Sequence, residues 1–146
     1  MDSIRQFGDS GGFIFAECGG FMYLTDMIEE SQTVGLLSGR SKMTKRLQRF
    51  GYIDLHLSHS CFLGPAGTKL TAHEFHRSET EIDSTYPTVF QIKKTGQERY
   101  WTCGYHFNNT VAGYPHFSYL GNLEMFEHML ATVERCRKHE VNKNRA

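Results

Sequence analysis

Residues 13–24, FIFAECGGFMYL, place a cysteine and two glycines between two apolar stretches of different periodicity. The run at residues 13–16 is short, continuous and bounded by glycines, which is typical of a buried strand. Residues 21–30 then carry apolar side chains at positions 21, 22, 24, 27 and 28, a spacing that predicts a helix. Cys18 is therefore expected at a sharp turn from strand to helix, which restricts the chain to folds that contain such a corner.

The rest of the chain alternates between strand-like and helix-like segments. Short strands are predicted at residues 34–39, 50–57, 69–75, 88–93, 99–104 and 111–114. Apolar residues at 123, 126, 129, 130 and 133 predict a final helix, for which Asn122 is the expected N-cap. Because no repeat or proline-rich linker interrupts the pattern, we expect one compact α/β domain over residues 1–146.

Composition excludes several classes of protein. The 146 residues are ordinary for one domain, and 16 basic against 16 acidic side chains give no reason to expect a nucleic acid or an anionic membrane as partner. No apolar segment approaches the roughly 20 residues needed to cross a bilayer, and no signal peptide is visible. Four cysteines lie far apart, so a cytoplasmic, reduced protein is expected.

A cysteine on a strand-to-helix turn has the features of a nucleophile. Glycines behind it allow the backbone to bend and a substrate to approach, and the helix N-terminus is expected to lower the pKa of the thiol. The Gly19 N–H is also placed to stabilise an oxyanion on an attacked carbonyl group. The alternative is a buried structural cysteine that packs after the strand.

A thiol nucleophile needs a base, and the chain has eight histidines. His116 follows the apolar stretch at residues 111–114, near the end of a predicted strand, where sites in α/β sheets gather. His56, His59 and Cys61 have a spacing that imitates a zinc site, but His56 and His59 point to opposite faces if the segment is a strand. We therefore assign no metal site, and His116 is the candidate partner of Cys18; the alternative is an ordinary loop histidine.

Five segments occur in a familiar order: AECGGFMYL, GLLSG, FGY, AHEFHRSE and AGYPHF. Together they resemble the C-terminal glutamine amidotransferase domain of the cobyrinate a,c-diamide synthase family, from about Ser3 to the last helix. The resemblance implies the three-layer, flavodoxin-like fold of class I amidotransferases. It also implies L-glutamine as substrate, Cys18 as nucleophile, His116 as base, and Gly19 and Gly20 at the oxyanion and substrate-binding position.

The chain departs from the pattern of that family at several positions. Ala72 stands where the family has glycine, and Arg77 where it has tyrosine; Gly113 and Pro115 differ as well. Ser118 occupies the place of a second histidine, where class I amidotransferases often carry a glutamate that orients the catalytic histidine. The third member of the catalytic triad is therefore unassigned.

The resemblance also implies parts that this sequence does not contain. The glycine loop of the oxyanion hole, the first strands of the domain and the ATP-binding synthetase domain are expected before residue 1, and no GxxxxGK[ST] phosphate loop occurs. We therefore expect a fragment that uses no cofactor itself, with ATP and Mg²⁺ on the synthetase domain. A cobyrinate-type tetrapyrrole, amidated on its a and c acetate side chains, is expected there too.

Three hypotheses follow for the function. The first is the glutaminase part of an amidoligase; the second is a catalytically impaired, amidotransferase-like module for binding or assembly. The third is a small thiol hydrolase, which requires a complete oxyanion hole within these residues. Missing strands predict an exposed apolar face, and hence a homodimer, a partner chain or a rearranged N-terminal segment.

Overall fold

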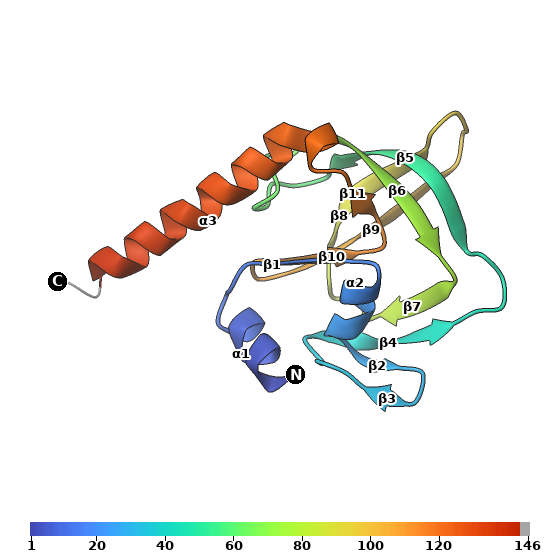
Figure 1. Ribbon diagram of the computed structural model, residues 1–146, viewed down its shortest axis with the longest axis horizontal. Helices are drawn as coiled ribbons and strands as arrows, with labels where there is room; N and C mark the ends of the chain where they lie inside the picture. Colours follow the sequence, from blue (N-terminus) through green and yellow to red (C-terminus); the bar gives the residue numbers. More distant parts are fainter. Residues whose placement is uncertain (144–146) are drawn as a thin grey trace.

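The computed structural model describes residues 1–143, and residues 144–146 of the predicted domain lie outside the description. Two sheets and a small number of helices form a mixed α/β fold, as predicted (Figure 1). The helical segments are α1 (Asp2–Asp9), α2 (Gly19–Leu24), η1 (Leu120–Asn122) and α3 (Leu123–Lys143).

Seven strands form the larger sheet, in the order β1-β10-β9-β8-β5-β6-β11. The pair β1–β10 is parallel, and every other pair in this sheet is antiparallel. The strands are β1 (Ile14–Glu17), β5 (Arg49–Leu57), β6 (Lys69–His76), β8 (Thr88–Lys94), β9 (Tyr100–Phe107), β10 (Thr110–Gly113) and β11 (His116–Phe117). Each strand predicted after residue 49 is therefore present.

The strands β1 and β10 separate two hydrophobic cores. Phe15 and Val111 face the core that is enclosed by the curved sheet, whereas Ala16 and Ala112 face the core beneath α2. A strand that is buried on both faces needs apolar residues at successive positions rather than at alternate ones. This requirement explains the uninterrupted apolar run at residues 13–16.

The smaller sheet has the order β3-β2-β4-β7 and corrects one prediction. Its strands are β2 (Thr25–Ile28), β3 (Ser31–Gln32), β4 (Leu37–Met43) and β7 (Ser78–Ile82). The helix predicted over residues 21–30 ends at Leu24, because the chain turns into β2 there. Thr25 is fully buried, its hydroxyl donates to the carbonyl groups on both sides of the bend, and β2 pairs with β4.

The final helix is confirmed, but its predicted cap is wrong. Asn122 belongs to η1, and its side-chain amide exchanges two hydrogen bonds with the backbone of Thr71 on β6, at 3.0 and 2.9 Å. This contact attaches the start of α3 to the sheet, and Met125 is buried in the core. The rest of α3 extends away from the body of the molecule (Figure 1).

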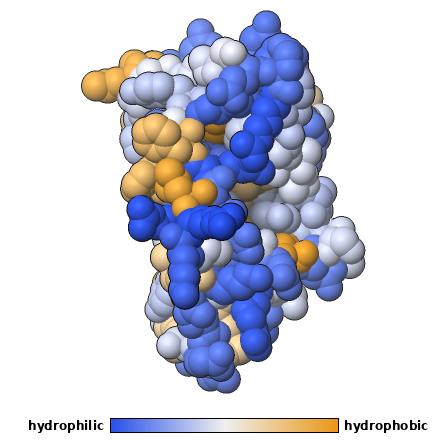
Figure 2. Space-filling view, turned by 90° about the vertical axis from the view of Figure 1, so that its right-hand side faces the viewer, coloured by the Kyte–Doolittle hydropathy of each residue, from blue (hydrophilic) through white to orange (hydrophobic). Residues whose placement is uncertain are grey.

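Some large apolar side chains are exposed on the surface, as in most folded proteins. Large ones include Phe50, Tyr52 and Phe75 on β5 and β6, which are 62%, 73% and 52% exposed. The face in Figure 2 is nevertheless mostly hydrophilic, and its hydrophobic residues gather in small, separate groups.

Candidate active site

Cys18 lies at the turn between β1 and α2, where the sequence predicted it. Its backbone is strained, with φ 47° and ψ −106°. Two backbone hydrogen bonds hold this conformation: the Cys18 N–H donates to Gly113 on β10 at 2.8 Å, and the Cys18 carbonyl accepts from Met22 at 3.0 Å. A non-glycine residue at positive φ costs energy and persists only where its surroundings impose it. The strained residue of the turn is therefore Cys18 itself, and its surroundings hold it in this conformation.

Of the two roles predicted for the glycines behind Cys18, the structure does not bear out the one in bending the backbone. Neither Gly19 nor Gly20 adopts a positive φ, so the bend does not depend on their flexibility. Both are exposed, and a Cβ atom added at Gly19 meets no other atom within 4 Å. Their contribution is open space beside the cysteine, through which a substrate can approach the sulfur.

Electrostatics at Cys18 also correct the prediction. Partial burial raises the pKa of the Cys18 thiol above its ordinary value, and the negative charges of Glu17 and Glu74 raise it further. The Gly19 N–H acts in the opposite direction, as the sequence suggested, but does not dominate. Without bound substrate, the thiol form of Cys18 is therefore favoured over the thiolate, and its activation needs a base.

His116 begins the short strand β11 and is half-buried. Because β1 and β10 run parallel with Glu17 opposite Gly113, both strands end at the same edge. Cys18 follows the end of β1 directly, and His116 follows the end of β10 after two residues. The topology therefore brings both predicted site residues to the carboxyl ends of one parallel pair of strands, the usual position of sites in such sheets.

Glu17 connects the segments that carry these two residues. Its Oε1 accepts a hydrogen bond from the Phe117 backbone N–H at 3.0 Å. Burial raises the pKa of the Glu17 carboxyl, whereas this hydrogen bond and the charge of His116 lower it. Ser118, in contrast, is exposed and its hydroxyl accepts from the Gly121 N–H.

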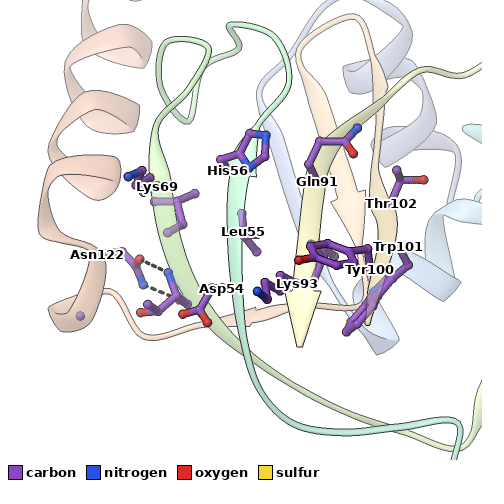
Figure 3. A pocket seen from close by; sticks show the side chains of 14 residues that line it. Asp54, Leu55, His56, Lys69, Gln91, Lys93, Tyr100, Trp101, Thr102 and Asn122 are labelled. Atoms are coloured by element: carbon purple, nitrogen blue, oxygen red, sulfur yellow. Dashed lines mark hydrogen bonds between the residues drawn. The ribbon is translucent and has the colours of Figure 1, made fainter. Parts of the chain in front are cut away.

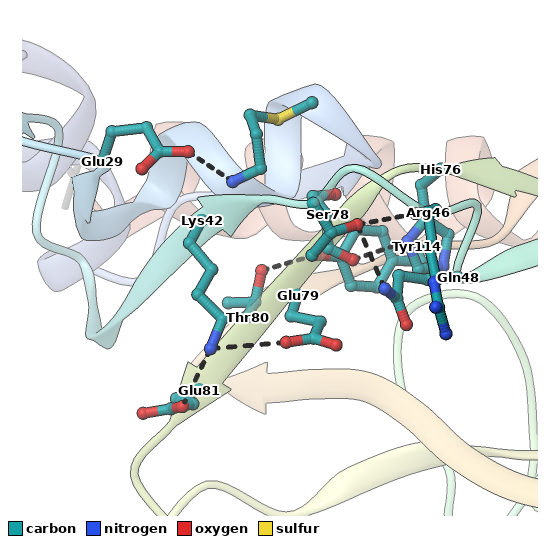
Figure 4. Close-up of polar contacts among 12 residues, drawn as sticks. Glu29, Lys42, Arg46, Gln48, His76, Ser78, Glu79, Thr80, Glu81 and Tyr114 are labelled. Carbon is teal, nitrogen blue, oxygen red and sulfur yellow. Dashed lines mark hydrogen bonds and ion pairs between the residues drawn. The ribbon is translucent and has the colours of Figure 1, made fainter.

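A second polar cluster, formed by Glu74, His76 and Tyr114, lies next to the corner and was missed from the sequence. Glu74 is 2% exposed and accepts from the Trp101 indole at 3.3 Å, and burial raises the pKa of its carboxyl. His76 stacks on Tyr114 with ring centroids 3.7 Å apart (Figure 4). The alternation of β6 was the available signal, since Glu74 and His76 share the inward face of Ala72.

The zinc alternative finds no support in the described residues. His56 is exposed, and His59 instead pairs with His106, with Nε2 and Nδ1 3.1 Å apart. Among the side chains of residues 1–138, no three His, Cys, Asp or Glu group as metal ligands would. None of the helices described is long and apolar enough to cross a membrane.

A large cavity lies away from this corner. Its volume is about 740 Å³, and it is lined by β5, β6, β8, β9 and Asn122 (Figure 3). Neither Cys18 nor His116 lines it. Because both predicted site residues lie at the end of the β1–β10 pair, we place the candidate site there and not in this cavity.

Comparison with known proteins decides the family. The sequence matches the CobB/CobQ-like glutamine amidotransferase domain over residues 1–123. The chain belongs to this family. The amidotransferase resemblance that was drawn from the five sequence segments is thereby confirmed.

Relatives of this amidotransferase carry the name cobyrinate a,c-diamide synthase. The protein from Clostridium tetani is 43% identical over 137 residues, which are 89% of this chain and 31% of the relative. Those from Clostridium acetobutylicum and Listeria monocytogenes are each 40% identical and cover 84% and 92% of this chain. The chain spans 31%, 28% and 31% of the length of these three relatives.

A solved structure supports the amidotransferase fold. A glutamine amidotransferase from Thermotoga maritima superposes on 98% of this chain and 54% of its own, with a TM-score of 0.51 and 14% sequence identity. At that identity the likeness concerns the fold alone. It agrees with the class I amidotransferase fold that the sequence predicted.

Proposed function

We propose that this chain carries the glutaminase half-reaction of an amidoligase. The Cys18 sulfur attacks the side-chain amide carbon of L-glutamine, and His116 takes up the thiol proton. The C–N bond then breaks, His116 delivers the proton to the leaving ammonia, and a glutamyl thioester remains. Water hydrolyses the thioester to glutamate and frees the thiol. The observation that carries this proposal is the strained, open Cys18 corner at the shared end of β1 and β10.

The oxyanion formed in the attack needs hydrogen-bond donors. The Gly19 N–H lowers the pKa of the Cys18 thiol, and the space beside Gly19 is open. We assign the Gly19 N–H as the oxyanion donor and Gly20 to the adjoining substrate-binding position, and we assign no second donor among residues 1–143. Loss of one such donor costs about 100- to 1,000-fold in rate. We therefore expect slow turnover unless another polypeptide segment completes the hole.

We assign no part of the amidation itself to the residues of this chain. By analogy with the relatives named cobyrinate a,c-diamide synthase, we propose that ammonia passes to an ATP-using part that amidates the a and c acetate side chains of a cobyrinate-type tetrapyrrole. The sequence here has no phosphate loop, and its described residues show no group of metal ligands. They do not fit ATP or Mg²⁺, and no step through either is assigned to them.

The test is covalent labelling by a glutamine analogue. 6-Diazo-5-oxo-L-norleucine alkylates a glutaminase cysteine as its diazo carbon is protonated and N₂ leaves. We expect one adduct per chain on Cys18 by peptide mass spectrometry, abolished in Cys18→Ala and retained in Cys61→Ala. An excess of L-glutamine should reduce the labelling, because it competes for the same site. A folded wild-type chain that takes up no label would overturn the proposal.

A second candidate is the impaired binding or assembly module. The raised pKa of the Cys18 thiol favours it, because such a module needs no activated thiol. The same experiment decides, since a module of this kind stays unlabelled. Four free cysteines agree with a cytoplasmic location for either function.

A further inference from the structure

The segment that carries His116 is weakly held by its own sheet. β11 has two residues and lies at one end of the seven-stranded order, where it pairs with β6 through His116 opposite His73 and Phe117 opposite Ala72. Two paired residues give little resistance to displacement, and the outward N–H of an edge strand has no strand to bond. A base on such a strand needs another contact to stay in place.

That contact comes from the opposite end of the sheet. β1 and β11 are the two edges in the strand order, yet Glu17 at the end of β1 accepts the Phe117 N–H at 3.0 Å. The rings of Phe15 and Phe117 lie 5.6 Å apart beneath this bond, so the two edges also meet in the core. The sheet thus curves until its edges are joined at the residue before Cys18 and the residue after His116.

We propose that Glu17 is the positioning residue of the site, which holds the His116 segment at the end of the β1–β10 pair that carries Cys18 by accepting from the Phe117 amide. This inference rests on the proposed function and adds the residue that performs the orienting role left open there. Ser118 lies two residues after His116, where class I amidotransferases often carry the glutamate that orients the histidine. Here it is exposed and accepts from Gly121, so it does not orient His116. Glu17 acts from the other strand and through the backbone.

The carboxylate also acts through its charge. The charge of His116 lowers the pKa of the Glu17 carboxyl, against the effect of burial. The negative charge of Glu17 opposes ionisation of the Cys18 thiol in the free corner. Glu17 is therefore expected to support the attack by Cys18 that depends on His116. It is not expected to support alkylation of the free thiolate, which needs no base.

Two variants test the role. Glu17→Gln keeps an oxygen acceptor for the Phe117 N–H and loses the charge, whereas Glu17→Ala loses both. We expect labelling by 6-diazo-5-oxo-L-norleucine to fall by roughly 100-fold in Glu17→Ala, because a small displacement of a catalytic group has that effect. In Glu17→Gln we expect a loss within about threefold, since a neutral acceptor makes the weaker bond. Alkylation of Cys18 by iodoacetamide should not fall in either variant.

A structural readout keeps the test independent of the chemistry. Amide hydrogen exchange at Phe117 should become roughly 10-fold faster in Glu17→Ala, the effect of one lost hydrogen bond, and stay near wild type in Glu17→Gln. Glu127→Ala, which removes an exposed carboxylate on α3, is the matched control and should change neither readout. Thermal melting checks that all variants are folded.

The outcomes separate this inference from the proposed function. If the wild-type chain takes up no label, the proposed function fails, and exchange at Phe117 still decides whether Glu17 holds β11. Unchanged exchange and labelling in Glu17→Ala would overturn the positioning role. Equal losses of labelling in Glu17→Gln and Glu17→Ala would overturn it as well, because the retained acceptor would then have no effect.

Discussion

The corner around Cys18 and the strand around Cys103 show how the backbone decides what a thiol can do. Cys18 is half-buried at positive φ, beside open space. Cys103 lies in β9, is 5% exposed, and its sulfur accepts the Tyr114 N–H at 3.4 Å. Burial raises the pKa of both thiols, that of Cys103 to about 11. Both sit next to β10, so the difference arises from conformation and access.

The largest expected difference between these regions is in thiol alkylation. With iodoacetamide under native conditions, Cys18 should react at least about 100-fold faster than Cys103, because Cys103 is reached only through local opening of the sheet. Peptide mass spectrometry at timed quenches gives both rates, with the exposed Cys136 as internal control. Equal rates would mean that Cys103 is as accessible as Cys18, and would refute the claim that access distinguishes the two thiols.

The second-largest expected difference between the two regions is the loss of stability caused by a glycine-to-alanine substitution. Gly104, which follows Cys103, has φ +72°, and an added Cβ lies 2.4 Å from the Phe90 ring. Gly104→Ala should lower the free energy of unfolding by about 2–4 kcal/mol, since it combines left-handed strain with overpacking. Gly19→Ala should change it by less than about 1 kcal/mol. Urea unfolding of the two variants measures both, and a larger loss for Gly19→Ala would refute the assignment of open space there.

The smallest effect is on alkaline stability. The pKa of Cys103 rises from 9.0 unfolded to about 11 folded, so the native state retains this proton longer. The resulting stabilisation is complete below pH 9 and is lost as the pH rises through about 11, an effect of about 2–3 kcal/mol. Cys103→Ala should flatten this part of the curve of unfolding free energy against pH. An identical slope in the variant would show that other groups cause it.

Local sequence predicted the corner and most strands of the larger sheet because their signals are local. The apolar run at residues 13–16 and the alternation in β5, β6 and β8 depend on few neighbours. The helical spacing of residues 21–30 misled because Thr25 is committed to pairing with Leu37 on β4, a contact that no local pattern reveals. In the same way, Asn122 looked like a cap but bonds to Thr71.

At the site, the sequence identified residue types better than it identified their surroundings. Cys18 and His116 were predicted from the turn and the resemblance, but the positive φ at Cys18 depends on contacts such as the bond to Gly113 on β10, and the direction of its pKa shift depends on burial and on the charges of Glu17 and Glu74. Glu17 stood beside Cys18 in the motif without a signal for its role. Its partner, Phe117, is 100 residues away in sequence.

That separation has a consequence for synthesis of the chain. β1 leaves the ribosome well before its parallel partner β10 and before the Phe117 amide, which lies 100 residues after Glu17. Until then Cys18 has no strand to impose its conformation, and loop closure over this span must precede any pairing. The corner at Cys18 therefore cannot assemble until β10 and the Phe117 amide have been synthesised, so during synthesis of the intervening residues the cysteine lacks the backbone conformation seen in the folded chain.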